Sequence, residues 1–109
     1  MVRRYSAELK ELVGNATTYR LGLDLAATCI AANLPASYVA EVFEVTRASI
    51  HVWFRGGTIR PRKRPKIEVF IKLVEDDMER GLLPAKTLLD ARHYLSDMVG
   101  RPIGIKELD

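Results

Sequence analysis

The sequence contains a single cysteine and no long apolar run. Cys29 is the only cysteine among 109 residues, which excludes an internal disulfide and any zinc finger built on paired cysteines. No apolar stretch approaches the roughly 18 residues that indicate a membrane-spanning helix. Residues 1–4 are not followed by the apolar segment of a signal peptide. We therefore expect a cytoplasmic protein with no membrane anchor.

Acidic residues are absent from one stretch of the chain. Residues 45–67 contain no aspartate or glutamate, and their seven basic residues give this stretch a charge of +7. Since the whole chain carries +3, the remainder carries −4. An electropositive strip on an otherwise acidic molecule is typical of a surface that meets a polyanion, although a solvated basic loop would have the same charge.

Apolar residues recur at helical spacing, and no alternating strand pattern of useful length is present. The pattern predicts a first helix from about residue 21 that ends at residues 33–35, and further helices over about residues 35–43, 47–54, 65–80 and 85–99, with a further turn or two over residues 6–13. The expected inward positions include Leu21, Leu25, Ala26, Cys29 and Ile30 in the first helix and Leu88, Leu89, Leu95 and Met98 in the last. We therefore expect a single all-α domain, residues 1–109, built as a five- to six-helix bundle.

Residues 36–56 match the spacing of a helix-turn-helix. The motif requires a small residue at its fifth position, where the two helices touch, and Ala40 stands there. Five further positions require apolar residues and are filled by Val39, Phe43, Val45, Ile50 and Trp53. Thr46 can cap the second helix, because its hydroxyl can accept a hydrogen bond from a first-turn amide.

This pattern resembles the Cro and repressor proteins of lambdoid phages and their bacterial relatives. The resemblance continues into residues 55–62, which are similar to the family's basic loop, and into residues 67–74, which are similar to its fourth helix. It implies a lambda repressor-like helix-turn-helix core over residues 20–82, and it leaves residues 83–109 as a C-terminal helix and tail that is a candidate dimerisation element. The ninth position of the motif is usually glycine, because the turn needs a positive φ there, and this chain has Glu44.

The resemblance implies sequence-specific binding of double-stranded DNA by a homodimeric transcriptional regulator, most often a repressor. The recognition helix, residues 47–54, would enter the major groove, where Arg47 could bind guanine with two hydrogen bonds. The candidate base contacts are Arg47, Ala48, Ser49, His51 and Val52. The candidate contacts to the DNA backbone or minor groove are Thr46, Arg55, Thr58, Arg60, Arg62, Lys63, Arg64 and Lys66, with Arg62 as the minor-groove residue.

Two other functions fit the same residues. A helix-turn-helix can serve as an adaptor for a transcription or recombination protein. Glu44 at the turn, Ala36 at the first position of the motif and the acidic helix of residues 75–79 allow that function. An architectural DNA-packaging factor would need only the basic residues 60–66 and not Arg47 or His51. We expect no enzyme, cofactor, metal or small-molecule ligand, since Cys29, His51 and His93 share no spacing typical of a metal site or a catalytic pair. Trp53 and Cys29 are expected in the core.

Overall fold

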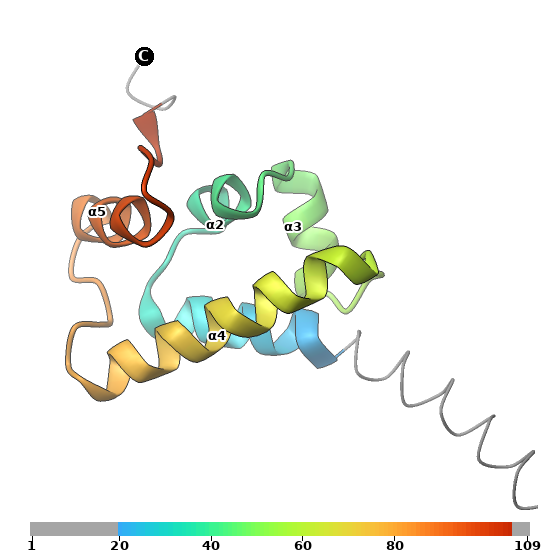
Figure 1. Cartoon of the computed structure of the whole chain (residues 1–109), viewed down its shortest axis with the longest axis horizontal. Helices are drawn as coiled ribbons and strands as arrows, with labels where there is room; N and C mark the ends of the chain where they lie inside the picture. The colour runs from blue at the N-terminus through green and yellow to red at the C-terminus, as the bar shows by residue number, and fades with distance from the viewer. Residues whose placement is uncertain (1–19, 106–109) are drawn as a thin grey trace, which may run out of the picture.

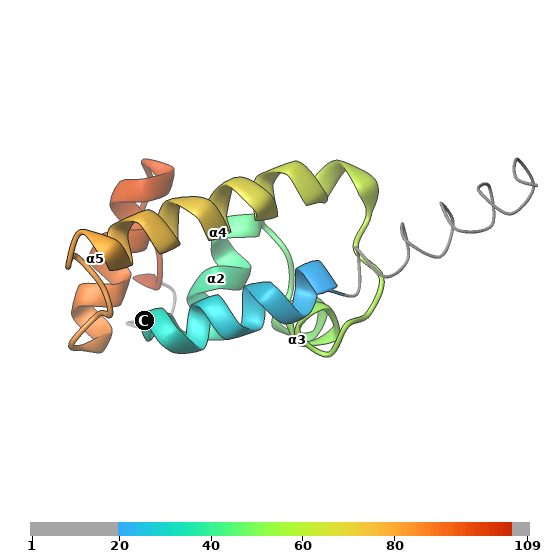
Figure 2. The same ribbon diagram turned by 90° about the horizontal axis from the view of Figure 1, so that it is seen from below.

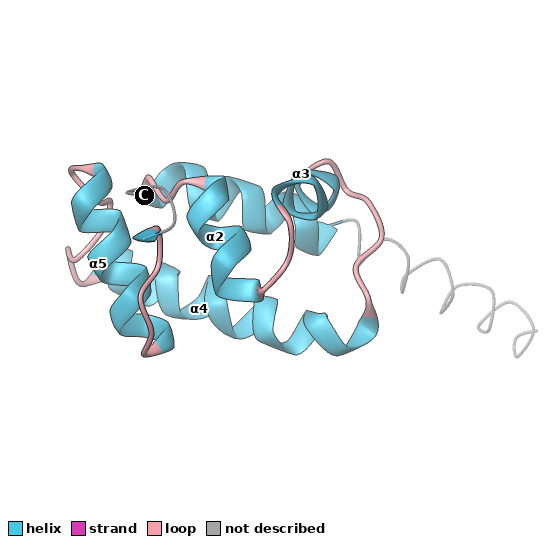
Figure 3. Ribbon diagram, turned by 90° about the horizontal axis from the view of Figure 1, so that it is seen from above, coloured by secondary structure: helices cyan, strands magenta, loops and turns pink. Residues whose placement is uncertain are grey.

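The computed structural model describes residues 20–105, so the turn expected over residues 6–13 lies outside it. The described residues form five α-helices and no strand, which confirms the all-α prediction (Figures 1 and 3). Residues 20–32 are helical, and they are followed by α2 (Ala36–Phe43), α3 (Arg47–Phe54), α4 (Arg64–Glu79) and α5 (Leu88–Val99). A short 3-10 helix, η1 (Pro61–Lys63), leads into α4.

The helices form two layers. The helix of residues 20–32 and the long α4 run side by side in one layer (Figure 2). The other layer is a row in which α2 lies between α3 and α5 (Figure 1). As a result, α3 lies near the N-terminal end of α4 and α5 near its C-terminal end. None of the helices in residues 20–105 is long and apolar enough to cross a membrane.

The turn between α2 and α3 takes the conformation that its sequence requires. Glu44 ends α2 in the left-handed region, with φ 57° and ψ 44°, as expected for a position that usually holds glycine. The amide of Val45 then donates to the carbonyl oxygen of Ala40 over 3.0 Å. Thr46 caps α3, since its hydroxyl oxygen accepts a hydrogen bond from the Ser49 amide over 3.1 Å. The predicted cap and the predicted end of α3 before Gly56 are both confirmed.

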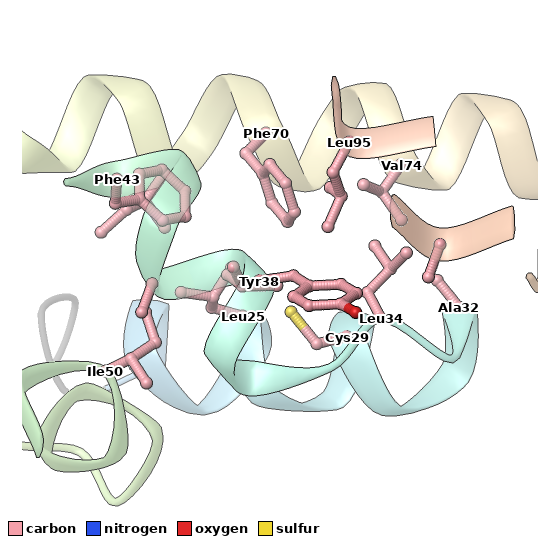
Figure 4. Close-up of a cluster of buried hydrophobic side chains, with 14 of the residues drawn as sticks. Leu25, Cys29, Ala32, Leu34, Tyr38, Phe43, Ile50, Phe70, Val74 and Leu95 are labelled. Atoms are coloured by element: carbon pink, nitrogen blue, oxygen red, sulfur yellow. The ribbon is translucent and has the colours of Figure 1, made fainter. Parts of the chain in front are cut away.

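The core joins both layers. Leu25, Val39, Ile50 and Ile67, one from each of the first four helices, have no exposed surface. Figure 4 shows further side chains of this cluster meeting between the layers. The ring of Phe43 packs edge-on against Trp53 at 5.9 Å and against Phe70 at 5.2 Å between ring centroids. Trp53 and Cys29 are buried, as predicted, and burial raises the pKa of the Cys29 thiol to about 12.

The predicted C-terminal helix is wrong at its start and on part of its buried face. α5 begins at Leu88 and not near Ala85, and its Thr87 cap accepts a hydrogen bond from the Asp90 amide. Leu88 and Leu89 are 58% and 51% exposed. The reason is that the preceding segment is not helical and buries Leu83 and Ala85 at this end of the core. The Ala85 amide donates to the carbonyl oxygen of Ala32 over 2.9 Å, and the Asn33 side chain donates to the carbonyl oxygen of Ala85 over 2.7 Å.

Smaller corrections concern side chains that helical periodicity placed inside. Ile30 is 81% exposed, because the inward stripe of its helix runs through Leu21, Leu25, Cys29 and Ala32. Ala26 and Met98 are half-buried. Leu95 is fully buried, as predicted. The buried face of α5 is thus made by Leu95 together with Ala91.

Candidate nucleic-acid interface

The outer face of α3 carries four of the five candidate base contacts. Ile50 and Trp53 bury the inner face of the helix in the core. Arg47, Ala48, His51 and Val52 are spaced so that they share the opposite side, whereas Ser49 lies one turn before Trp53 at the border of the buried face. Arg47, Ala48, His51 and Val52 are exposed, and Ser49 is half-buried. The structure therefore brings four of the five side chains to one solvent-facing surface and leaves Ser49 at its edge.

Two hydroxyl groups order the start of this face. Besides accepting the Ser49 amide, the Thr46 hydroxyl donates to the Ser49 hydroxyl over 3.0 Å. Thr46 is exposed at the N-terminus of α3, where the helix dipole favours an anion such as phosphate. Its structural role as a cap is established, and its contact with a phosphate stays a prediction.

The loop after α3 is held close to the helix. A Cβ at Gly57 would lie 2.3 Å from the Val52 side chain, so only glycine allows this approach. Ile59 is fully buried and anchors the loop between the exposed residues Thr58 and Arg60. Sequence reasoning missed this anchor, and the only available signal was an apolar residue with a polar neighbour on each side. Because Ile59 is fixed, the cations around it project outward from a defined backbone.

One hollow joins the helix and the loop. Its lining includes Ala48, Ser49 and Val52 from α3 and Thr58, Arg60, Arg62 and Lys63 from the loop and η1. The structure therefore places part of the predicted base-contact set next to part of the predicted backbone-contact set. Among the described residues that line this hollow, Glu44 is the only acidic one.

The predicted basic residues are not equivalent in the structure. Arg55, Arg60, Arg62 and Lys66 are exposed. Lys63 is half-buried, and its Nζ atom donates to the carbonyl oxygen of Phe43 over 2.9 Å. Arg64 is also half-buried, and its Nε atom is buried without a hydrogen-bond partner among the described residues. The basic strip thus divides into cations that face solvent and cations that are partly built into the fold.

Residues near the C-terminus support the end of α2, just before its turn into α3, and sequence reasoning missed them. The guanidinium of Arg101 donates to the carbonyl oxygen of Glu41 over 2.6 Å, and the Gly104 amide donates to the Glu41 carboxylate. Arg101 and Ile105 line a second hollow together with Thr46 and Ser49. No local pattern could reveal these contacts, because the partners are about 60 residues apart in sequence.

The structure does not bring the other reactive side chains together. Cys29 lies in the core, whereas His51 and His93 are exposed on α3 and α5, at opposite ends of the upper row of helices (Figure 1). Residues 20–105 contain no group of three histidine, cysteine or acidic residues that could hold a metal ion. No protein-family model, curated protein or solved structure matches the chain. The interface is therefore interpreted from its own geometry and charge.

Proposed function

We propose that the chain is a lambda repressor-like helix-turn-helix protein that binds double-stranded DNA sequence-specifically and regulates transcription, as a repressor that occupies an operator. The observation that carries this proposal is the shared surface of α3 and the loop after it. Exposed residues of a short capped helix and exposed arginines of an anchored loop line one hollow. Such a surface can present a helix to base edges and cations to phosphates at the same time.

The proposed roles follow from position on this surface. The face of α3 enters the major groove, where Arg47 pairs with guanine and His51 donates to a base or a phosphate. Ala48 and Val52 are small and apolar enough to contact a thymine methyl group. Arg60 and Arg62 bind phosphates, and Arg62 reaches toward the minor groove. These contacts separate sequence reading by α3 from affinity supplied by the loop.

A single domain of this kind reads only a few base pairs. Useful specificity therefore needs two copies on two half-sites, and we propose that the chain acts as a homodimer. α5 was the expected interface, but Leu95 is fully buried within the protomer and is not available to a second copy. The other leucine of the expected interface, Leu88, is exposed in the first turn of α5.

The test is selection of bound sequences from a randomised duplex-DNA library at near-physiological salt. Enrichment of an inverted repeat, with half-sites about 10 base pairs apart, is expected. In a second selection, Arg47→Ala should relax the preference at one base pair, by about 1–3 kcal/mol of discrimination. Lys86→Ala removes an exposed cation far from α3 in sequence and should leave the motif unchanged.

Two outcomes would contradict the proposal. Retained DNA without an enriched motif would instead identify an architectural factor that uses the basic loop alone. Absence of retained DNA would exclude a DNA-binding function for this surface and would direct attention to protein partners.

A further inference from the structure

An apolar groove lies on the side of α4 that faces the ends of α2 and α5. Its lining includes Val42 of α2, Lys66, Val69 and Leu73 of α4, and Met98 and Val99 of α5. Val69 and Leu73 are 58% and 43% exposed, although they lie one turn apart on a helix whose other face completes the core. Adjacent exposed apolar side chains beside an apolar groove are typical of a surface that another helix covers.

The charges of α4 oppose its own dipole. Residues 64–71 contain two basic residues and one acidic residue, whereas residues 72–79 contain one basic and four acidic residues. Cations at a helix N-terminus and acids at its C-terminus are unfavourable, because they meet the end of the dipole that has their own sign. DNA binding accounts for the basic end of α4 but not for the acidic end. A second α4 running antiparallel would bring each acidic end against a basic end.

The exposed stripe of α4 is self-complementary. Lys66, Val69, Leu73 and Asp76 are all exposed, and they follow one another at intervals of three, four and three residues. This spacing places them along one side of the helix. The intervals are the same in both directions, and the two ends have opposite charge. In an antiparallel pair centred on residue 71, Lys66 of each copy faces Asp76 of the other, and Val69 faces Leu73.

We propose that two copies of the chain dimerise through this stripe, with their α4 helices antiparallel and the partner's Val69 and Leu73 covering the apolar groove. This is the interface of the homodimer proposed above, and the inference rests on the proposed function. With a helical rise of about 1.5 Å per residue, the two Arg64 residues that begin α4 lie roughly 21 Å apart along the pair. Because α3 lies near the N-terminal end of α4, the two recognition helices lie toward opposite ends of the antiparallel pair, as two half-sites require.

The test is sedimentation equilibrium of the full chain without DNA, over a hundredfold range of protein concentration. The wild type is expected to pass from monomer to dimer. Lys66→Glu and Asp76→Lys should each weaken dimerisation about tenfold, because each places like charges together twice in a symmetric pair. The double variant should restore dimerisation to within about threefold of the wild type, since it exchanges the two ends of the stripe.

Two further variants separate the interface from a general effect of charge or folding. Glu75→Lys makes the same charge change as Asp76→Lys on the neighbouring exposed residue, but it lies off the stripe and should leave dimerisation unchanged. Leu73→Glu should give a folded monomer, because Leu73 contributes an exposed side chain and not a core one. Its thermal unfolding midpoint should match that of the wild type at a concentration at which the wild type is also monomeric.

A wild type that stays monomeric overturns the inference. It does so even if the groove then binds an unrelated amphipathic peptide. Equal effects of Asp76→Lys and Glu75→Lys, or a double variant as weak as the single ones, also overturn it. The proposed function fails separately: a monomer that still selects a DNA motif removes this interface alone, whereas a dimer that retains no DNA removes the DNA-binding function alone.

Discussion

Lys63 donates a hydrogen bond from its Nζ atom to the carbonyl oxygen of Phe43, the last residue of α2. The final carbonyl groups of a helix have no partner within the helix, and they form the negative end of its dipole. The last turn of α2 contains no basic residue of its own. Lys63 and Arg101 supply the missing cations from outside, and both contacts lie just before the turn that leads to α3. The basic strip therefore stabilises the turn as well as facing solvent.

The two roles can be separated by comparing Lys63 with the exposed Arg62. Lys63→Ala is expected to lower the free energy of unfolding by about 1–2 kcal/mol, because a charge-assisted hydrogen bond to a helix end is lost. Arg62→Ala should change it by less than about 0.5 kcal/mol. Under the proposed function, Arg62→Ala also removes the minor-groove contact, so it weakens DNA binding and lowers the salt dependence of that binding. Urea unfolding and salt-dependent binding measure these effects, and an equal loss of stability in both variants would contradict the role of Lys63.

Glu44 should tolerate glycine unusually well. Its left-handed conformation costs a residue with a Cβ atom about 1 kcal/mol, which offsets the entropy that glycine adds to the unfolded chain. We expect Glu44→Gly to leave the free energy of unfolding unchanged or to raise it. Glu68→Gly, at an exposed position inside α4, should lower it by about 1 kcal/mol. If both variants lost the same amount in urea unfolding, Glu44 would not be under the strain that its φ indicates.

Two leucines of α5 should respond differently to the same substitution. Leu95→Asp places a carboxylate among fully buried side chains and is expected to cost more than about 4 kcal/mol, enough to unfold a domain of ordinary stability. Leu88→Asp alters a side chain that is 58% exposed and should leave the fold intact. Circular dichroism during thermal unfolding distinguishes the two. A folded Leu88→Asp variant that had lost a wild-type dimer would place the interface on α5 and not on α4.

The stability of the protein should fall at alkaline pH because of Cys29. Its pKa is raised from 9.0 to about 12 by burial, so between these values the folded state keeps a proton that the unfolded state releases. The free energy of unfolding therefore decreases as the pH rises through this interval. Burial and the hydrogen bond to Asp77 also raise the pKa of Tyr94, with the same sign. Urea unfolding below and above pH 9 should show a smaller decrease for Cys29→Ala. An unchanged decrease would show that the thiol is not its source.

Local rules were sufficient for the middle of the chain. The spacing of apolar residues and the Thr46 cap predicted α2 and α3 closely, because both helices are short, adjacent and fixed by a turn with strict requirements. The same rules placed Trp53 inside and Arg47 outside, as the structure has them. Two short helices joined by one turn can be predicted from nearby residues, without information from distant ones.

Long-range contacts decided the rest. Periodicity alone cannot distinguish the non-helical segment around Ala85, which bonds to Ala32, from a first helical turn. A run of basic residues cannot reveal that Lys63 bonds to a helix end whereas Arg62 faces solvent. In both cases the deciding partner lies at least 20 residues away in sequence. The sequence therefore predicted where the candidate interface lies, but not the long-range hydrogen bonds that hold the surrounding helices in place.

The contacts of Arg101 and Gly104 with Glu41 also set an order of events during synthesis. A ribosome releases α2 and α3 well before residues 101–104, and the loop that these contacts close spans about 60 residues. Until that segment emerges, the carbonyl oxygen and the carboxylate of Glu41 are hydrated and the end of α2 is held by fewer bonds. The turn between α2 and α3 can thus close first, and the contacts that fasten the end of α2 to the C-terminal segment form later.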